Sequence, residues 1–158
     1  MQKNFISAIL ILLVFMNIWC ARSASAAIHF NIPDVQQISL GDSNINLNLI
    51  YSGNYQTLYE PRTINSTYSI VSTGTPKTLF AQINQNMPAN STLEIKAEAP
   101  DNATSMGFVT LSTIPTAVIT NISDVSRQNL LLYYRLKAQL GTPVSVNESR
   151  IVTFTIMD

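Results

Sequence analysis

The sequence predicts an all-β protein, an antiparallel β-sandwich preceded by a signal-peptide helix. After residue 27, hydrophobic residues recur with a period of two, and turn-forming residues interrupt them at short intervals. Long stretches with the helical spacing of three and four residues are missing from this part of the sequence. Strict alternation places one face of each strand on a core and the other in solvent.

The first 27 residues have the organisation of a secretory signal peptide. Lys3 supplies a short basic region, residues 5–19 are almost entirely apolar, and residues 24–26 are the small residues that a signal peptidase reads. The alternative is an uncleaved membrane anchor, but the apolar run is shorter than the roughly 20 residues of a spanning helix. We therefore expect cleavage near Ala27 and no stable membrane span afterwards.

Cleavage at this point changes the chemistry of the mature chain. It removes Cys20, the single cysteine, and the bulky Trp19 before that cysteine does not suit a lipidation signal. The mature domain, residues 28–158, is then expected to contain no disulfide. Cleavage also removes Lys3 and Arg22, which leaves seven basic and nine acidic residues and a mildly acidic domain.

Four segments show the period-two alternation most clearly. Residues 44–51, 92–99, 130–140 and 150–157 each place apolar side chains on one face and polar side chains on the other. From the last three segments we expect these core residues: Leu93, Ile95, Leu132, Tyr134, Leu136, Val152, Phe154 and Ile156.

Weaker strands are predicted where β-branched and aromatic residues are enriched. Residues 123–128 are predicted to form a single helical turn. Turn-forming residues separate the segments, and no repeat or linker divides them, so one domain is expected. The weaker strands cover residues 28–32, 35–40, 67–73, 78–84, 108–112 and 118–122.

The charge composition excludes several classes of function. Only 11% of the residues are charged, the formal net charge is 0, and 46% are hydrophobic, whereas about 25% of residues are charged in an average globular protein. No basic cluster suits a phosphate backbone, so nucleic-acid binding is not expected. Asn, Gln, Ser and Thr replace Lys and Glu on the outward faces, which removes the usual protection against edge pairing. Self-association or contact with other surface proteins is therefore expected.

No set of residues points to catalysis, and no metal or cofactor is expected. The single histidine, His29, lies beside the expected cleavage site, where a chain end is usually frayed. Glu94 and Glu98 share a strand face with Lys96 between them, which favours a solvated row of charges over a pair of catalytic acids. The glycines form no phosphate-binding loop.

Other polar features lie mainly in the predicted turns. Residues 42–44 and 101–102 contain one aspartate each, which is too few carboxylates for a tight calcium site. Residues 51–59 contain three tyrosines, which either contact a ligand or belong to the core and its rim. In a eukaryotic secreted protein, five sequons would mark glycans: Asn65, Asn90, Asn102, Asn121 and Asn147.

The C-terminal half resembles a group of small secreted bacterial proteins, mostly uncharacterised. The resemblance covers about residues 65–157 and rests on LEIK at 93–96, GFVTLST at 107–113, ITNI at 119–122 and RIVTFTI at 150–156. These proteins look immunoglobulin-like and are distantly similar to pilus subunits. The resemblance implies an immunoglobulin-like β-sandwich in the periplasm, at the cell surface or in the medium, and it supplies no catalytic residue.

The sequence departs from pilus subunits in one respect and is ambiguous in another. Many such subunits carry a cysteine pair, which the mature chain lacks. They also carry an alternating N-terminal extension that completes a neighbour's sandwich. Ile28, Phe30 and Ile32 alternate in that place, but a strand within its own sheet shows the same pattern. We expect a non-enzymatic exported protein with a structural or surface-interaction role, fimbrial-like or, alternatively, an adhesin-like module that binds carbohydrate or protein.

Overall fold

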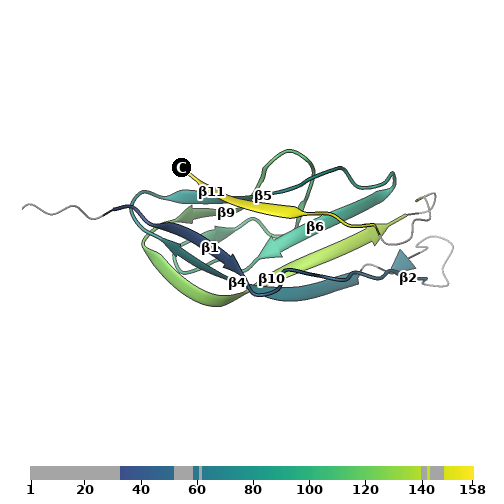
Figure 1. The fold of residues 1–158 in the computed structure, drawn as a ribbon, viewed down its shortest axis with the longest axis horizontal. Coiled ribbons are helices and arrows are strands. Elements are labelled where there is room, and N and C mark those ends of the chain that lie inside the picture. Colours follow the sequence, from purple (N-terminus) through teal and green to yellow (C-terminus); the bar gives the residue numbers. More distant parts are fainter. Residues whose placement is uncertain (1–32, 52–58, 61, 140–141, 143–147) are drawn as a thin grey trace, which may run out of the picture. The chain divides into compact units, whose positions relative to one another are not determined.

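Antiparallel strands make up the regular structure of the described residues in the computed structural model (Figure 1). The structure describes residues 33–51, 59–60, 62–139, 142 and 148–158, which lie within the unit Pro33–Asp158. The predicted signal peptide and the strand expected at residues 28–32 fall outside these ranges. Within them, no helix is long and apolar enough to cross a membrane.

The strands form two larger sheets and one short hairpin. In the order of pairing, the five-stranded sheet contains β1 (Gln36–Leu40), β4 (Arg62–Ser72), β10 (Val125–Ala138), β6 (Ser91–Ala97) and β8 (Val109–Thr110). The four-stranded sheet contains, in order, β11 (Val152–Met157), β5 (Lys77–Ile83), β9 (Thr116–Ile122) and β7 (Thr104–Ser105). The hairpin pairs β2 (Ile50–Tyr51) with β3 (Tyr59–Glu60).

Both sheets contribute to one hydrophobic core. Burial alternates along β5 and along most of β6, as expected for strands that turn one face inward. The prediction of an all-β, antiparallel fold is confirmed. The largest apolar side chains that are almost fully enclosed are Tyr68, Ile70, Leu79, Ile83, Ile95, Ile119, Ile122 and Leu132.

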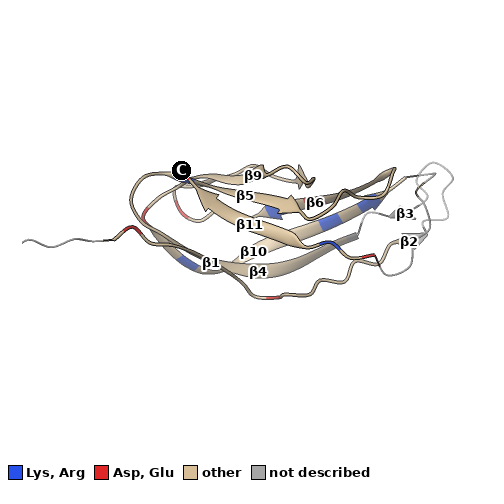
Figure 2. Ribbon diagram, turned by 45° about the horizontal axis from the view of Figure 1, so that its top comes forward, with Lys and Arg blue, Asp and Glu red and all other residues tan. Residues whose placement is uncertain are grey.

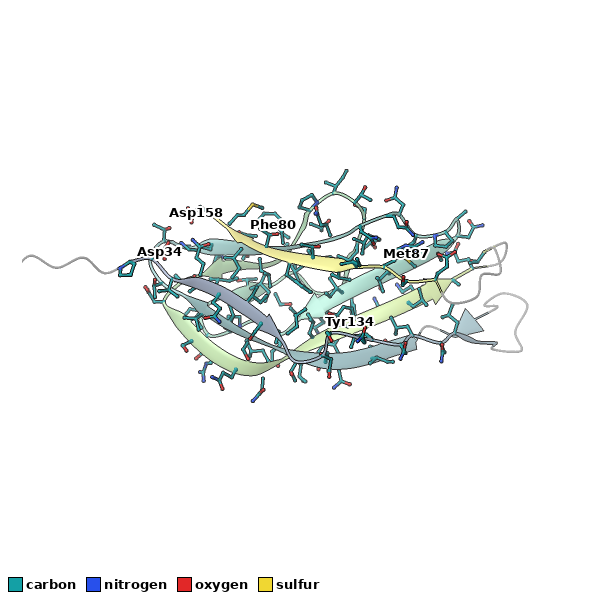
Figure 3. All side chains as sticks on the ribbon, viewed as in Figure 1. Asp34, Phe80, Met87, Tyr134 and Asp158 are labelled. Carbon is teal, nitrogen blue, oxygen red and sulfur yellow. The ribbon has the colours of Figure 1, made fainter. Side chains whose placement is uncertain are left out.

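The predicted core residues differ in how far they are buried. Four of them are buried, namely Leu93, Ile95, Leu132 and Tyr134, the last of which is labelled in Figure 3. The three from β11 pack against the core but stay half-buried, because β11 is the outer strand of its sheet: Val152, Phe154 and Ile156. Leu136 is also half-buried and does not belong to the buried cluster, contrary to the prediction.

Residues 44–51 show that alternation predicts faces better than it predicts pairing. Only β2, at the end of this segment, joins a ladder. Residues 44–49 belong to no strand, yet their exposure still alternates, and Ile45 and Leu47 pack against the core. The sequence pattern therefore identified which side chains turn inward, although the strand predicted here is mostly absent.

The helical turn predicted at residues 123–128 is wrong. β10 begins at Val125, and its first residues pair with the end of β4, Val125 opposite Ser72 and Arg127 opposite Ile70. The register then shifts between Arg127 and Leu130, as in a β-bulge. Pairing with a strand distant in the sequence outweighed the weak local preference for a turn.

Candidate interaction surfaces

The outer strands of the two sheets, β1 and β11, contact one another, and we call them together the β1–β11 edge (Figure 1). Neither strand contains a charged residue. The inward side chain of Ile38 is half-buried, like the three inward side chains of β11. Leu40 and Met157 are 43% and 41% exposed. This edge therefore combines apolar side chains with outer strands that lack the usual protective charges.

The hydrogen bonds beside β11 show which of its backbone groups face outward. The Asn84 N–H donates to the Ile151 carbonyl at 3.1 Å, and the Ile151 N–H donates to Asn84 Oδ1 at 2.9 Å. Because hydrogen bonding alternates along an antiparallel strand, the backbone groups of Thr153 and Thr155 also face β5. Those of Val152, Phe154 and Ile156 point the other way, where no described strand pairs with them.

One end of the β1–β11 edge is held by a buried lysine. The side chain of Lys77, the first residue of β5, is fully enclosed. Its Nζ lies 2.9 Å from Asp34 Oδ2 and 3.1 Å from Asp158 Oδ1, and Figure 3 shows both aspartates at the same end of the sheets. We call these three residues the Lys77 clasp. Asp34 precedes β1 and Asp158 follows β11, so the clasp ties both outer strands to β5.

The charges of the clasp stabilise one another. The hydrogen bond from Lys77 is the main reason why the pKa of Asp34 lies below its usual value. In return, the hydrogen bond to Asp34 raises the pKa of Lys77 and outweighs the opposing effect of burial. Both groups are therefore charged at neutral pH. This cluster is not visible in the sequence, because its members lie far apart in the chain and form no motif.

A second group of charges lies on the outward face of β6 and β10, where Figure 2 shows blue segments close together. Glu94 is central to it, and its side chain is only 12% exposed. Glu94 Oε1 lies 2.7 Å from Lys137 Nζ, and Oε2 accepts a hydrogen bond of 2.6 Å from Arg135 Nε. Burial raises the pKa of Glu94, but the hydrogen bonds from Lys137 and Arg135 outweigh it and hold the pKa below the usual value.

Glu94, Lys96 and Glu98, which were predicted to form a solvated row of charges, have three different environments. Glu94 binds the cations of the neighbouring strand instead of Lys96. Lys96 Nζ lies 5.9 Å from the ring centre of Phe108 and 5.7 Å from that of Tyr133. The Glu98 carboxylate accepts the Leu131 N–H at 2.9 Å. The neighbouring strands determine the surroundings of each of these three charges, and the sequence of one strand does not show which strands are its neighbours.

The aspartates considered for calcium have protein partners. Asp42 accepts a hydrogen bond of 2.8 Å from the hydroxyl of Ser66, which is buried on β4. Asp101 forms an ion pair with Arg127. In the part of the chain that the structure describes, no three His, Cys, Asp or Glu side chains are grouped as a metal site would require.

The remaining predicted features are placed only in part. Tyr55, His29, Cys20 and the side chains of Tyr51 and Tyr59 lie outside the described residues, so the tyrosine segment stays a prediction. Among the sequons, Asn147 is also outside. The other four are exposed, and three of them have a positive φ of 59° to 63°: Asn90, Asn102 and Asn121.

The fold and these surfaces define a class, an all-β protein with two antiparallel sheets around a shared core. No model of a known protein family matches the chain, and no curated protein matches it either.

Proposed function

We propose that this chain is an exported, immunoglobulin-like β-sandwich with a structural, non-enzymatic role outside the cytoplasm. In this proposal it is a fimbrial-like subunit, and its β1–β11 edge pairs with a second copy of the chain. The N-terminal 27 residues serve as the signal peptide and are removed on export.

The observation that carries the proposal is the uncharged outer strand β11. It pairs with β5 on one side, while the backbone groups of Val152, Phe154 and Ile156 face away from that ladder. The side chains of these residues are only half-buried. An added strand would satisfy the backbone groups and cover the apolar side chains together, which is how β-strand addition works.

A second copy fits this edge because the edge carries no charge of its own. Two identical charged edges would repel one another when they meet, whereas Thr153 and Thr155 present neutral side chains beside the outward backbone. The runner-up is an adhesin-like module that uses the tyrosines at residues 51–59, and the described residues add nothing for it there.

The test is the mass of the processed chain in solution. The chain is expressed with its own N-terminus, purified after processing by the cell, and measured by size-exclusion chromatography with light scattering over a range of concentrations. We expect oligomers that grow with concentration. Thr153→Lys with Thr155→Lys places two charges on the outer strand and should shift the chain to monomer.

Thr120→Lys is the matched control, because Thr120 lies on β9, an inner strand of the same sheet. This variant should assemble as the unchanged chain does. A chain that stays monomeric at all concentrations would contradict the proposal, as would an equal effect of the lysines on β9 and on β11.

A further inference from the structure

Lys96 is the cation on the outward face of β6 that the structure leaves without an ion pair among the described residues. The neighbouring cations, Arg135 and Lys137, both bind Glu94. Lys96 is directly opposite Tyr133 in the ladder between β6 and β10, and its ammonium group lies near the rings of Tyr133 and Phe108. A cation near aromatic rings can still bind an anionic partner.

A surface depression of about 360 Å³ lies beside this ammonium group. The depression is open to solvent, so a ligand bound there keeps part of its surface exposed. The residues around it include one tyrosine, one lysine, one glutamate and one serine. We call it the Lys96 depression, and its lining residues are Lys96, Ala97, Glu98, Ala99, Ser105, Leu131 and Tyr133.

The polar groups of the depression are held in place by the backbone around them. The Glu98 N–H donates to the Leu131 carbonyl at 2.8 Å, and Glu98 Oε2 accepts the Leu131 N–H at 2.9 Å. Ser105 Oγ donates to the Ala97 carbonyl at 2.6 Å, which joins β7 of one sheet to β6 of the other. Groups that are already fixed cost less to order when a ligand binds.

We propose that the Lys96 depression binds a sugar that carries a carboxylate, such as a uronic acid residue of a polysaccharide. The ligand's carboxylate binds the Lys96 ammonium, and an apolar face of the sugar ring lies against Tyr133. A sugar hydroxyl donates to the Glu98 carboxylate, which keeps one oxygen beyond the hydrogen bond from Leu131.

The charge of the lining favours this class of ligand over other anions. One cation and one carboxylate line the depression. A doubly charged phosphate near Lys96 would also be repelled by the Glu98 carboxylate. A sugar acid carries one negative charge, which binds Lys96, and its hydroxyl groups can donate hydrogen bonds to Glu98. The depression involves neither β1 nor β11, so this proposal and the proposed assembly can each fail without the other.

The experiment compares an acidic sugar with its neutral counterpart. The processed chain is titrated by calorimetry with trigalacturonic acid, with the neutral galactose trisaccharide of the same linkage, and with inorganic phosphate. We expect the acidic trisaccharide to bind about tenfold more tightly than the neutral one, which is the effect of one charge-assisted hydrogen bond. Inorganic phosphate should not compete with the acidic trisaccharide for the Lys96 depression.

Two variants and a control locate the binding. Lys96→Met keeps the apolar stem and should abolish the preference for the acidic sugar. Tyr133→Leu should weaken binding of both sugars. Lys137→Met removes a cation from the same face that is paired with Glu94, and it should leave the preference unchanged.

Three results would overturn the proposal. The first is no binding of the acidic sugar to the unchanged chain, a measurement that does not depend on any variant. The second is competition by phosphate, and the third is an equal loss of preference in Lys96→Met and Lys137→Met. The last result would mean that only the general charge of the face matters.

Discussion

Ser66 and Ser72 lie on the same strand, β4, and both are buried, but only one hydroxyl has a partner. Ser66 Oγ donates to Asp42 at 2.8 Å. Ser72 Oγ is buried and makes no hydrogen bond to any described atom. A buried hydroxyl without a partner loses its hydration and gains nothing in exchange.

This difference predicts that the same substitution has different effects at the two positions. Ser72→Ala should leave the free energy of unfolding unchanged or raise it by up to about 1 kcal/mol, because it removes the unsatisfied group. Ser66→Ala should lower it by about 1 kcal/mol, because it removes a hydrogen bond. Urea unfolding of both variants measures this, and a Ser72→Ala variant that loses as much stability as Ser66→Ala would contradict it.

The Lys77 clasp predicts that loss of its two carboxylates destabilises the protein more than loss of its lysine does. Lys77 is fully enclosed, whereas the side chains of Asp34 and Asp158 are 48% and 76% exposed. Removal of the lysine leaves two carboxylates that water can reach, but removal of both carboxylates leaves an enclosed cation without an anionic partner in the clasp.

Asp34→Asn combined with Asp158→Asn should therefore lower the melting temperature by several degrees. Lys77→Met should lower it less, because the methionine fills the enclosed space without a charge. Differential scanning calorimetry at neutral pH compares the two. A larger drop in melting temperature for Lys77→Met than for the double variant would contradict this prediction.

At the scale of the element, β11 allows the backbone of an edge strand to be tested separately from its side chains. The Val152 N–H faces away from β5, so Val152→Pro removes an outward donor without breaking the ladder. It should cost little stability but reduce assembly in light scattering. Thr153→Pro removes a donor that faces β5, so it should lower the free energy of unfolding more than Val152→Pro does.

At the scale of the whole molecule, the ion pairs predict how stability depends on pH. The folded state lowers the pKa of Asp34 and of Glu94 below 3.8 and 4.5, their usual values. Their contribution to stability is therefore fully present above these values and is lost as the pH falls through the lower folded values. The pKa of Lys77 is raised, so its contribution to stability is fully present at low and neutral pH. It is lost only as the pH rises above 10.5.

Urea unfolding from pH 7 down to pH 2 should therefore show a decline that begins near pH 4. Glu94→Gln should make this decline shallower, because it removes one of the two described carboxylates whose pKa is lowered. A decline of unchanged slope in Glu94→Gln would exclude Glu94 as a source of acid sensitivity.

The sequence by itself determined the class of the fold and the faces of most strands. Period-two alternation places Leu93 and Ile95 on the inward face of their strand, because side chains on a strand point to alternate faces. This holds whichever strand is their neighbour. Ile45 and Leu47, in a segment with the same sequence alternation, also pack against the core, although they belong to no strand.

Only the tertiary structure decided which strands are neighbours, and with it the environment of each charge. Because β11 is an outer strand, its inward residues stay half-buried, and because β10 lies beside β6, Glu94 binds Arg135 instead of Lys96. The enclosed Lys77 meets aspartates from both ends of the described unit. Such contacts join residues distant in the chain, so they depend on sheet order, which local periodicity does not encode.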